Sequence, residues 1–425
     1  MKPSVLLDYQ AAVERDGFVV RALLKLEGQA PENGRAPLNI SLVLDRSGSM
    51  SGDKLHFARN AAAMLVRRLS PEDVVSVVTY DNEVHTVAPP ARGVAQPGLA
   101  DTIGRIEAGS TTNLSGGWLK AREHLQQGRT LDERIKTNRL VLLTDGLANV
   151  GITNGDQLVG LCRQALENGV TTTTIGFGAD YDEQLLRSMA DAGGGNTFYI
   201  ETPDQAPGVF EEEIEGLLSL AAQNISIEVR PTGEVELVRV HHDLPAHQIE
   251  GGFALDFGDL YAREPRSVLI EFFAPYILDS TPREIARIVM RADILTAEGG
   301  VEHQEITLPI ASALSAEGHS EPEIQRQVLL LSAAKAREEA LRRRDMGDFG
   351  GAEHVLRETS AALSVAACDA PDVSEQATDL GALADQMRAN SFGELEAKYM
   401  RQRAYNAHRG KQLYEEKLRR KREAE

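Results

Sequence analysis

Between residues 38 and 203 the sequence alternates short apolar runs with longer amphipathic stretches, and this alternation constrains the fold more than any other feature. The apolar runs are typical of buried strands, and the stretches between them have helical spacing. We expect strands at 38–44, 74–80, 140–144, 171–177 and 197–200, helices at 53–69, 99–106, 117–126, 157–168 and 183–192, and an antiparallel edge at 84–87. Strands joined by helices of this length run parallel, with right-handed crossovers. The pattern therefore predicts a doubly wound, Rossmann-like α/β domain with a mostly parallel sheet over 38–203.

The flanking sequences predict two other architectures. Residues 17–27 alternate like a strand but have no partner in a parallel sheet, so we expect residues 1–37 to join the β-unit that follows the α/β domain. After an expected linker helix at 204–223, alternating segments and turn signals over 224–315 predict a β-sandwich-like unit. Residues 320–425 have the spacing of antiparallel helices. The α/β domain is thus expected to be inserted into a β-unit, with a helical region after it.

The charge balance excludes some partners and leaves others open. The chain has 64 acidic and 45 basic residues and a net charge of −19, whereas DNA binding needs a surplus of Lys and Arg, so no DNA is expected. Residues 398–425 hold ten Lys and Arg against four Glu, a charge of +6 that leaves −25 on the rest. Such a basic tail is a candidate for contact with RNA, an acidic surface or the protein's own body.

Other features indicate a cytoplasmic protein. No uncharged apolar run approaches the length that spans a bilayer, and the first residues lack the apolar segment of a signal peptide. The two cysteines, Cys162 and Cys368, lie far apart and lack the spacing of a zinc knuckle. We expect both as small buried thiols in a reducing compartment.

Polar residues with oxygen side chains follow three of the expected α/β elements. Asp45, Ser47 and Ser49 come directly after the first strand, the segment 109–113 with its threonines opens a helix, and Asp145 ends a central strand. The carboxyl ends of parallel strands meet at one edge of a sheet, where ligands of such folds bind. Two carboxylates with hydroxyls suit a hard divalent ion, Mg²⁺ above all, with Mn²⁺ or Ca²⁺ as alternatives. Because hydroxyls donate little charge, such a metal stays electrophilic and is expected to accept a carboxylate from another molecule.

This arrangement resembles the complete metal-ion-dependent adhesion site of the von Willebrand factor type A domain, in a bacterial multi-domain type. The resemblance places the threonine ligand at Thr112 rather than at its neighbour, because the family's threonine is usually followed by Asn. It implies that Ser47, Ser49 and Thr112 contact the metal, with Asp45 and Asp145 acting directly or through water. It also implies a protein-interaction module rather than an enzyme, completed by an Asp or Glu of a partner protein.

Several alternatives remain open. Each piece of the pattern alone is also typical of a helix N-cap. The chain is also a candidate accessory subunit of an ATPase or of a kinase or phosphatase complex, and a metal-dependent phosphoesterase using Asp45 is a less favoured reading. Arg46 and Asn149 are expected at the rim of the site as candidate partner contacts. We expect Trp118 in the core and the histidines at 241, 242 and 247 in a solvated loop.

Overall fold

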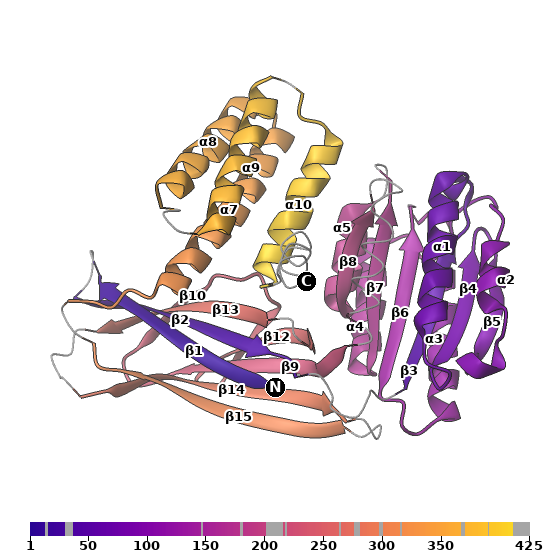
Figure 1. Ribbon diagram of the computed structural model, residues 1–425, viewed down its shortest axis with the longest axis horizontal. Coiled ribbons are helices and arrows are strands. Elements are labelled where there is room, and N and C mark those ends of the chain that lie inside the picture. Colours follow the sequence, from indigo (N-terminus) through magenta and orange to yellow (C-terminus); the bar gives the residue numbers. More distant parts are fainter. Residues whose placement is uncertain are drawn as a thin grey trace. The chain divides into compact units, whose positions relative to one another are not determined.

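The chain divides into two compact units, and the sequence of the second interrupts that of the first. The computed structural model describes residues 1–12, 16–29, 37–145, 148–178, 182–200, 216, 219–262, 265–275, 281–296, 301–314, 317–366, 370–389 and 391–410. The first unit consists of Met1–Gln29, Ala222–Asp293 and His303–Glu425, and the second consists of Ala30–Ala221 and Ile294–Glu302. Figure 1 shows the helices and strands of both units.

The second unit is built on a six-stranded sheet in the order β5-β4-β3-β6-β7-β8 (Figure 1). Its strands are β3 (Leu38–Asp45), β4 (Val74–Tyr80), β5 (Val84–Arg92), β6 (Thr137–Thr144), β7 (Val170–Phe177) and β8 (Gly194–Ile200). Neighbouring strands pair in parallel except β5, which returns antiparallel to β4. Every residue of the central strands β3, β4 and β6 is buried, as expected for parallel strands covered on both faces. The predicted doubly wound α/β fold is confirmed.

Helices cover both faces of this sheet and create two apolar cores. On one face lie α1 (Asp53–Arg68) and α2 (Leu99–Gly104), and on the other α3 (Leu114–Gly128), α4 (Gly155–Glu167) and α5 (Glu183–Ala192). Trp118 of α3 is fully buried in the second core, and its indole N–H donates to the Thr172 hydroxyl at 3.3 Å. Cys162 of α4 is buried in the same core, while Cys368 lies outside the described residues. Because the helices shield both faces, the ends of the strands are the part of the sheet that a ligand can reach.

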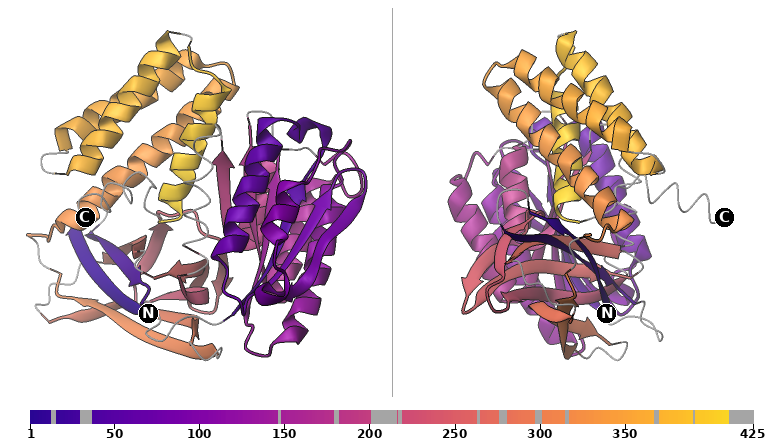
Figure 2. Two further views of the ribbon diagram at one scale, coloured as in Figure 1. Left: turned by 45° about the vertical axis from the view of Figure 1, so that its right-hand side comes forward. Right: turned by 90° about the vertical axis from the view of Figure 1, so that its left-hand side faces the viewer.

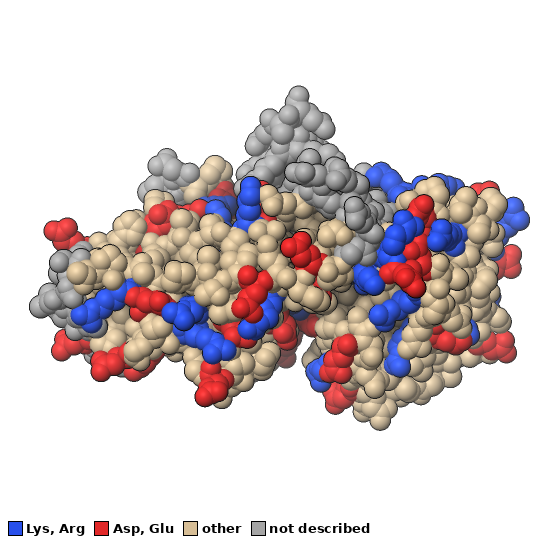
Figure 3. All heavy atoms as spheres, turned by 90° about the horizontal axis from the view of Figure 1, so that it is seen from below, with Lys and Arg blue, Asp and Glu red and all other residues tan. Residues whose placement is uncertain are grey.

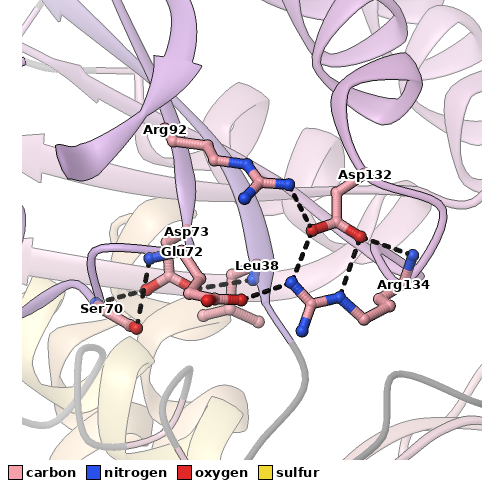
Figure 4. A network of polar contacts seen from close by, with 7 residues as sticks. All are labelled: Leu38, Ser70, Glu72, Asp73, Arg92, Asp132 and Arg134. Atoms are coloured by element: carbon pink, nitrogen blue, oxygen red, sulfur yellow. Dashed lines mark hydrogen bonds and ion pairs between the residues drawn. The ribbon is translucent and has the colours of Figure 1, made fainter. Parts of the chain in front are cut away.

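A network of hydrogen bonds and ion pairs lies at the edge of the sheet where the parallel strands begin (Figure 4). The Asp73 carboxylate accepts from the backbone N–H of Leu38 at 2.8 Å, which fixes the first residue of β3. Nearby, Asp132 accepts from Arg92 at 2.9 Å and from Arg134 at 2.7 Å. The two guanidinium groups hold the pKa of Asp132 at about 2, with the hydrogen bonds from Arg134 as the largest cause. The candidate site described below lies at the opposite edge, where the strands end.

The described residues of the first unit form two sheets. One has the order β1-β2-β13-β10, and the other has the order β11-β12-β9-β14-β15. The strands of the first sheet are β1 (Lys2–Ala11), β2 (Gly17–Glu27), β13 (Pro265–Pro275) and β10 (Glu236–Val240). Those of the second are β11 (Ala246–Ile249), β12 (Gly252–Tyr261), β9 (Leu220–Pro231), β14 (Arg283–Leu295) and β15 (Val301–Ser312). The strand expected at 17–27 is β2, and it pairs antiparallel with β13 along its whole length.

One boundary of the expected linker helix at 204–223 is wrong. Strand β9 already begins at Leu220, so residues 220–223 belong to a sheet. Their side chains explain the error, because the apolar run 220–222 is also compatible with the end of a helix. Residues 201–215 and 217–218 of the expected helix lie outside the described residues.

Among the described residues of the first unit, four helices follow the sheets and pack side by side (Figure 2). They are α7 (Pro322–Asp345), α8 (Phe349–Ala366), α9 (Pro371–Arg388) and α10 (Glu394–His408). Ile324 and Leu331 of α7 pack on Leu23 and Leu269 of the first sheet, and so join the helices to it. The basic tail begins in α10, and its residues 411–425 lie outside the described residues.

The expectation of solvated histidines is wrong for two of the three. His242 is 5% exposed, and its Nδ1 accepts from the backbone N–H of Leu269 at 3.0 Å. His241 lies beside Glu271, with Nε2 3.3 Å from the carboxylate. Only His247, on β11, is exposed. The error arose because β10 continues into a segment that packs against β13, a contact remote in sequence.

Charged side chains of both signs share the surface visible in Figure 3. Lys and Arg lie beside Asp and Glu there, with no large patch of one sign. On the second sheet, for example, Arg291 pairs with Glu305 at 2.8 Å and also with Glu228. In the described part of the chain, no helix has the length and apolar character needed to cross a membrane.

Candidate metal site

Two neighbouring parallel strands bring the predicted carboxylates to one edge. Strand β3 ends at Asp45 and strand β6 ends at Thr144, one residue before Asp145. The register of the two strands places Leu44 beside Leu143, so the residues that follow emerge next to each other. The Thr144 hydroxyl accordingly donates to Asp45 Oδ2 at 2.7 Å.

The serines after β3 link the two carboxylates into one hydrogen-bonded cluster. The backbone N–H of Ser47 donates to Asp45 Oδ1 at 2.7 Å, which turns the chain sharply at the end of the strand. The hydroxyls of Ser47 and Ser49 lie 3.1 Å apart, and Ser49 Oγ donates to Asp145 Oδ1 at 2.8 Å. Four of the five predicted ligands are therefore joined by direct contacts. Ser49 is exposed, so the cluster reaches the surface.

Backbone hydrogen bonds hold the fifth predicted ligand, Thr112, at the same edge. The loop before α3 is tied to the loop after β3, because Gly48 N–H donates to Ser110 O at 2.7 Å and Gly109 N–H donates to Arg46 O at 2.5 Å. Thr112 itself is buried, and its carbonyl accepts from the N–H groups of Asn149 and Val150. The structure thus brings the three predicted segments together, with Thr112 positioned through its main chain.

Gly109 is required by the close packing of this loop. A Cβ at this position would lie 1.9 Å from Asp81 Oδ2, too near for any side chain. The Asp81 carboxylate takes that space because it pairs with Arg46 at 2.9 Å. Asp81 also accepts through its carbonyl from the N–H of Asn113, next to Thr112.

Burial makes the negative charge of this cluster costly. Asp45 is fully buried, and desolvation raises the pKa of its carboxyl above the usual range, although the hydrogen bonds from Thr144 and Ser47 oppose the shift. The charge of Asp145 raises the pKa of Asp45 further. Burial together with the charge of Asp45 also raises the pKa of the neighbouring Tyr80 hydroxyl well above its ordinary value. A bound cation would relieve this repulsion.

One cation of the protein already contacts the cluster, and sequence reasoning missed it. Lys54 of α1 places Nζ 2.5 Å from Asp145 Oδ2. In the sequence, the indication of this contact was a lysine in the first turn of the helix that follows Ser47 and Ser49. Of the two expected rim residues, Arg46 is engaged with Asp81, and Asn149 is exposed beside Thr112.

The residues present fit a hard divalent ion. The two carboxylates and the two serine hydroxyls form an all-oxygen donor set, Thr112 lies at the same edge, and the carboxylate oxygens are already oriented by the protein. Within the described ranges, no group of three or more His, Cys, Asp and Glu side chains is arranged to hold a metal. The cluster differs from such sites because hydroxyls replace most of the charged ligands. This set favours Mg²⁺ over metals that need nitrogen or sulfur.

Comparison with known proteins identifies the domain that carries this site. Residues 39–212 match the family model of the von Willebrand factor type A domain. A solved structure described as a von Willebrand factor type A protein from Catenulispora acidiphila has the same fold, with a TM-score of 0.71 and 15% identity over 97% of each chain. The α/β unit of this chain is therefore a von Willebrand factor type A domain, a family of protein-interaction modules.

Curated relatives extend beyond this domain. An uncharacterized protein of Synechocystis, sll0103, is 25% identical over 334 residues, which cover 76% of this chain and 78% of that protein. An uncharacterized protein of Escherichia coli K12, YfbK, is 28% identical over 260 residues, or 59% of this chain. The match spans only 45% of the Escherichia coli protein. Two of the relatives that this chain matches are thus bacterial proteins.

Proposed function

We propose that this chain is a metal-dependent protein-interaction module. In this proposal Asp45, Ser47, Ser49, Thr112 and Asp145 hold Mg²⁺, and an Asp or Glu of a partner protein completes the coordination. The observation that carries the proposal is the hydrogen-bonded cluster of two carboxylates and two serines at the carboxyl edge of the sheet. Hydroxyl ligands neutralise little of the charge of the ion, so the ion attracts a carboxylate of a partner strongly.

The chain's own residues orient the donors for this task. Ser47 N–H and the Thr144 hydroxyl each hold one oxygen of Asp45, and Ser49 holds one oxygen of Asp145. Backbone bonds hold the loop of Thr112 in place independently of any ligand. When bound, the ion would supply a Lewis-acidic position for the partner's carboxylate. Pre-oriented donors reduce the conformational entropy lost on binding.

A hollow beside the site supports recognition of an acidic partner. It has a volume of about 430 Å³ and extends from Arg46 past His85 to Arg105. Ile106 and Glu107 also line it. A partner segment whose carboxylate reaches the metal therefore has room for a neighbouring side chain near the guanidinium of Arg105.

The direct test is metal binding by the whole chain, followed by partner capture. Mn²⁺ binding is measured by electron paramagnetic resonance for the native chain and for Asp45→Asn. Asparagine keeps the size of the side chain and an oxygen that can accept from Ser47, so the fold should survive while the charge is lost. Asp101→Asn is the matched control, because Asp101 lies on α2 of the same domain and is exposed. We expect Mn²⁺ affinity to fall at least tenfold in Asp45→Asn and to stay unchanged in Asp101→Asn.

Partner capture then tests the second half of the proposal. Proteins retained by the native chain in Mg²⁺ should be lost in chelator and also lost with Asp45→Asn in Mg²⁺. A retained partner should lose binding when one of its own Asp or Glu residues is replaced. The proposal fails if the native chain does not bind Mn²⁺, or if capture is the same with chelator as with Mg²⁺.

A further inference from the structure

Lys54 contacts the candidate metal site from a defined position. Its Nζ lies 2.5 Å from Asp145 Oδ2, and the Asp145 side chain is 1% exposed. The other oxygen of Asp145 accepts from Ser49. A charge-assisted bond to a carboxylate this well shielded from water is stronger than an ordinary surface ion pair. Lys54 is therefore a fixed part of the electrostatics of the site.

The side chain of Lys54 packs against the backbone of Gly178, directly after strand β7. A Cβ at Gly178 would lie 2.8 Å from Lys54 Cε and 3.2 Å from Nζ. Gly178 also has a φ of +77°, which favours glycine, and its N–H donates to Ile200 O at 3.1 Å. The backbone at the ends of β7 and β8 thus leaves space that the lysine fills. The ammonium is directed to Asp145 by packing as well as by charge.

The lysine changes the charge of the site by one unit. Asp45 and Asp145 together carry −2, which a divalent ion alone would neutralise. With Lys54 present, the same ion would bring the site to +1. The Lys54 ammonium and the divalent ion would then both lie near Asp145. A partner's carboxylate would approach a site of net positive charge.

We propose that Lys54 is a built-in competitor of the metal, which lowers the metal affinity of the site and strengthens its attraction for a partner's carboxylate. This inference rests on the proposed function. A metal that uses Asp145 must either displace the Lys54 ammonium from Oδ2 or bind beside it. Displacement breaks the ion pair with Asp145, and binding beside the ammonium brings two cations close together, so metal binding is weakened in both cases. The positive charge of Lys54 near the site also favours an incoming acid.

The test replaces the charge and keeps the stem. Lys54→Met is compared with Lys120→Met, a matched control on α3 of the same domain. Lys120 is 35% exposed and bonds Glu123 at 2.8 Å, while Lys54 is 31% exposed. Mn²⁺ alone is titrated into each full-length chain and followed by electron paramagnetic resonance. We expect Lys54→Met to bind Mn²⁺ about tenfold more tightly or better, because a unit charge near a divalent ion is removed. Lys120→Met should match the native chain.

A third variant separates charge from packing. Lys54→Arg keeps the positive charge, so its Mn²⁺ affinity should stay near that of the native chain. If Lys54→Arg gains affinity as much as Lys54→Met, charge is not the cause and the inference is overturned. It is also overturned if the native chain and Lys54→Met bind Mn²⁺ equally well, a result that leaves the proposed function standing. If neither chain binds Mn²⁺, both proposals fail.

A hexaglutamate peptide tests the effect on an acidic ligand. Its binding to each chain is measured by biolayer interferometry at saturating Mn²⁺, so that metal occupancy is equal. We expect Lys54→Met to bind the peptide at least threefold more weakly than the native chain and Lys120→Met to bind it equally well. Equal peptide binding by Lys54→Met and the native chain would overturn the second half of the inference.

Discussion

Acid should destabilise the first unit through the buried side chain of His242. Its Nδ1 accepts from Leu269 N–H at 3.0 Å, so a proton on Nδ1 would face another donor. Burial is the largest cause that lowers the pKa of His242, and the nearby charges of His408, His241, Arg266 and Lys335 add to it. Together they bring the pKa from 6.5 to about 3. The folded unit therefore keeps this histidine neutral down to low pH.

The sign and size of the effect follow from proton uptake. Below pH 6.5 the unfolded chain binds a proton at His242 that the folded chain does not bind until about pH 3. The stabilisation is thus fully present above pH 6.5 and is lost as the pH falls. One proton of difference lowers the free energy of unfolding by about 1.4 kcal/mol per pH unit, or about 2 kcal/mol between pH 6.5 and pH 5. Glu271 has a pKa of about 2, set first by its hydrogen bond with His241, so it contributes only below about pH 4.5.

The assay is urea unfolding between pH 7 and pH 5, with the native chain compared with His242→Asn. Asparagine offers an oxygen that can accept from Leu269 N–H but takes up no proton. Its unfolding free energy should therefore depend on pH less steeply, by about 1.4 kcal/mol per unit. His247→Asn is the control, since His247 is exposed in the same unit and should keep the native slope. The reasoning is refuted if His242→Asn and the native chain show the same slope.

Three further substitutions test packing and the site. Trp118→Ala should lower the free energy of unfolding by about 3–5 kcal/mol, measured by circular dichroism in urea, because a fully buried indole is removed; a loss below 1 kcal/mol would contradict the packing. Gly109→Ala should weaken Mn²⁺ binding, because its Cβ would displace Asp81 and the loop of Thr112, whereas Gly104→Ala has open space and should bind normally. Arg337→Met should cost about 2 kcal/mol in urea unfolding, since it removes hydrogen bonds to Gln376 and Asp379 while Arg403 still pairs with Asp379, and the exposed Arg388→Met should cost little. Equal costs for the two arginine variants would show that burial does not matter there.

Prediction from the sequence succeeded where structure is local. The strand at 74–80 and the helix at 183–192 have the predicted bounds, because alternating burial and helical spacing are properties of neighbouring residues. Strand β14 was not among the expected segments, although its burial alternates over 286–293, and residues 2–11 were expected to join the β-unit without the bounds of a strand being given. The end of the expected linker helix was wrong because a short apolar run does not distinguish a strand from a helix.

The candidate site was predictable because chain direction decides where parallel strands end. Asp45 and Asp145 each follow a strand of one parallel sheet, so their meeting at one edge needed no knowledge of distances. The position of Lys54 was not predictable, because it depends on the space left above Gly178 and on the angle of α1. Arg46 was expected to face a partner, and only the structure shows it paired with Asp81.

The sequence by itself determined the doubly wound domain, its insertion between strands of another unit and the oxygen-rich edge where three segments meet. These features depend on residue spacing and chain direction, which are written in the order of residues. Tertiary structure alone decided which groups are shielded around that edge, that Lys54 pairs with Asp145, and that His242 is buried and neutral. Burial and electrostatic contact join residues far apart in the chain, so their energies become defined only when the fold brings them together.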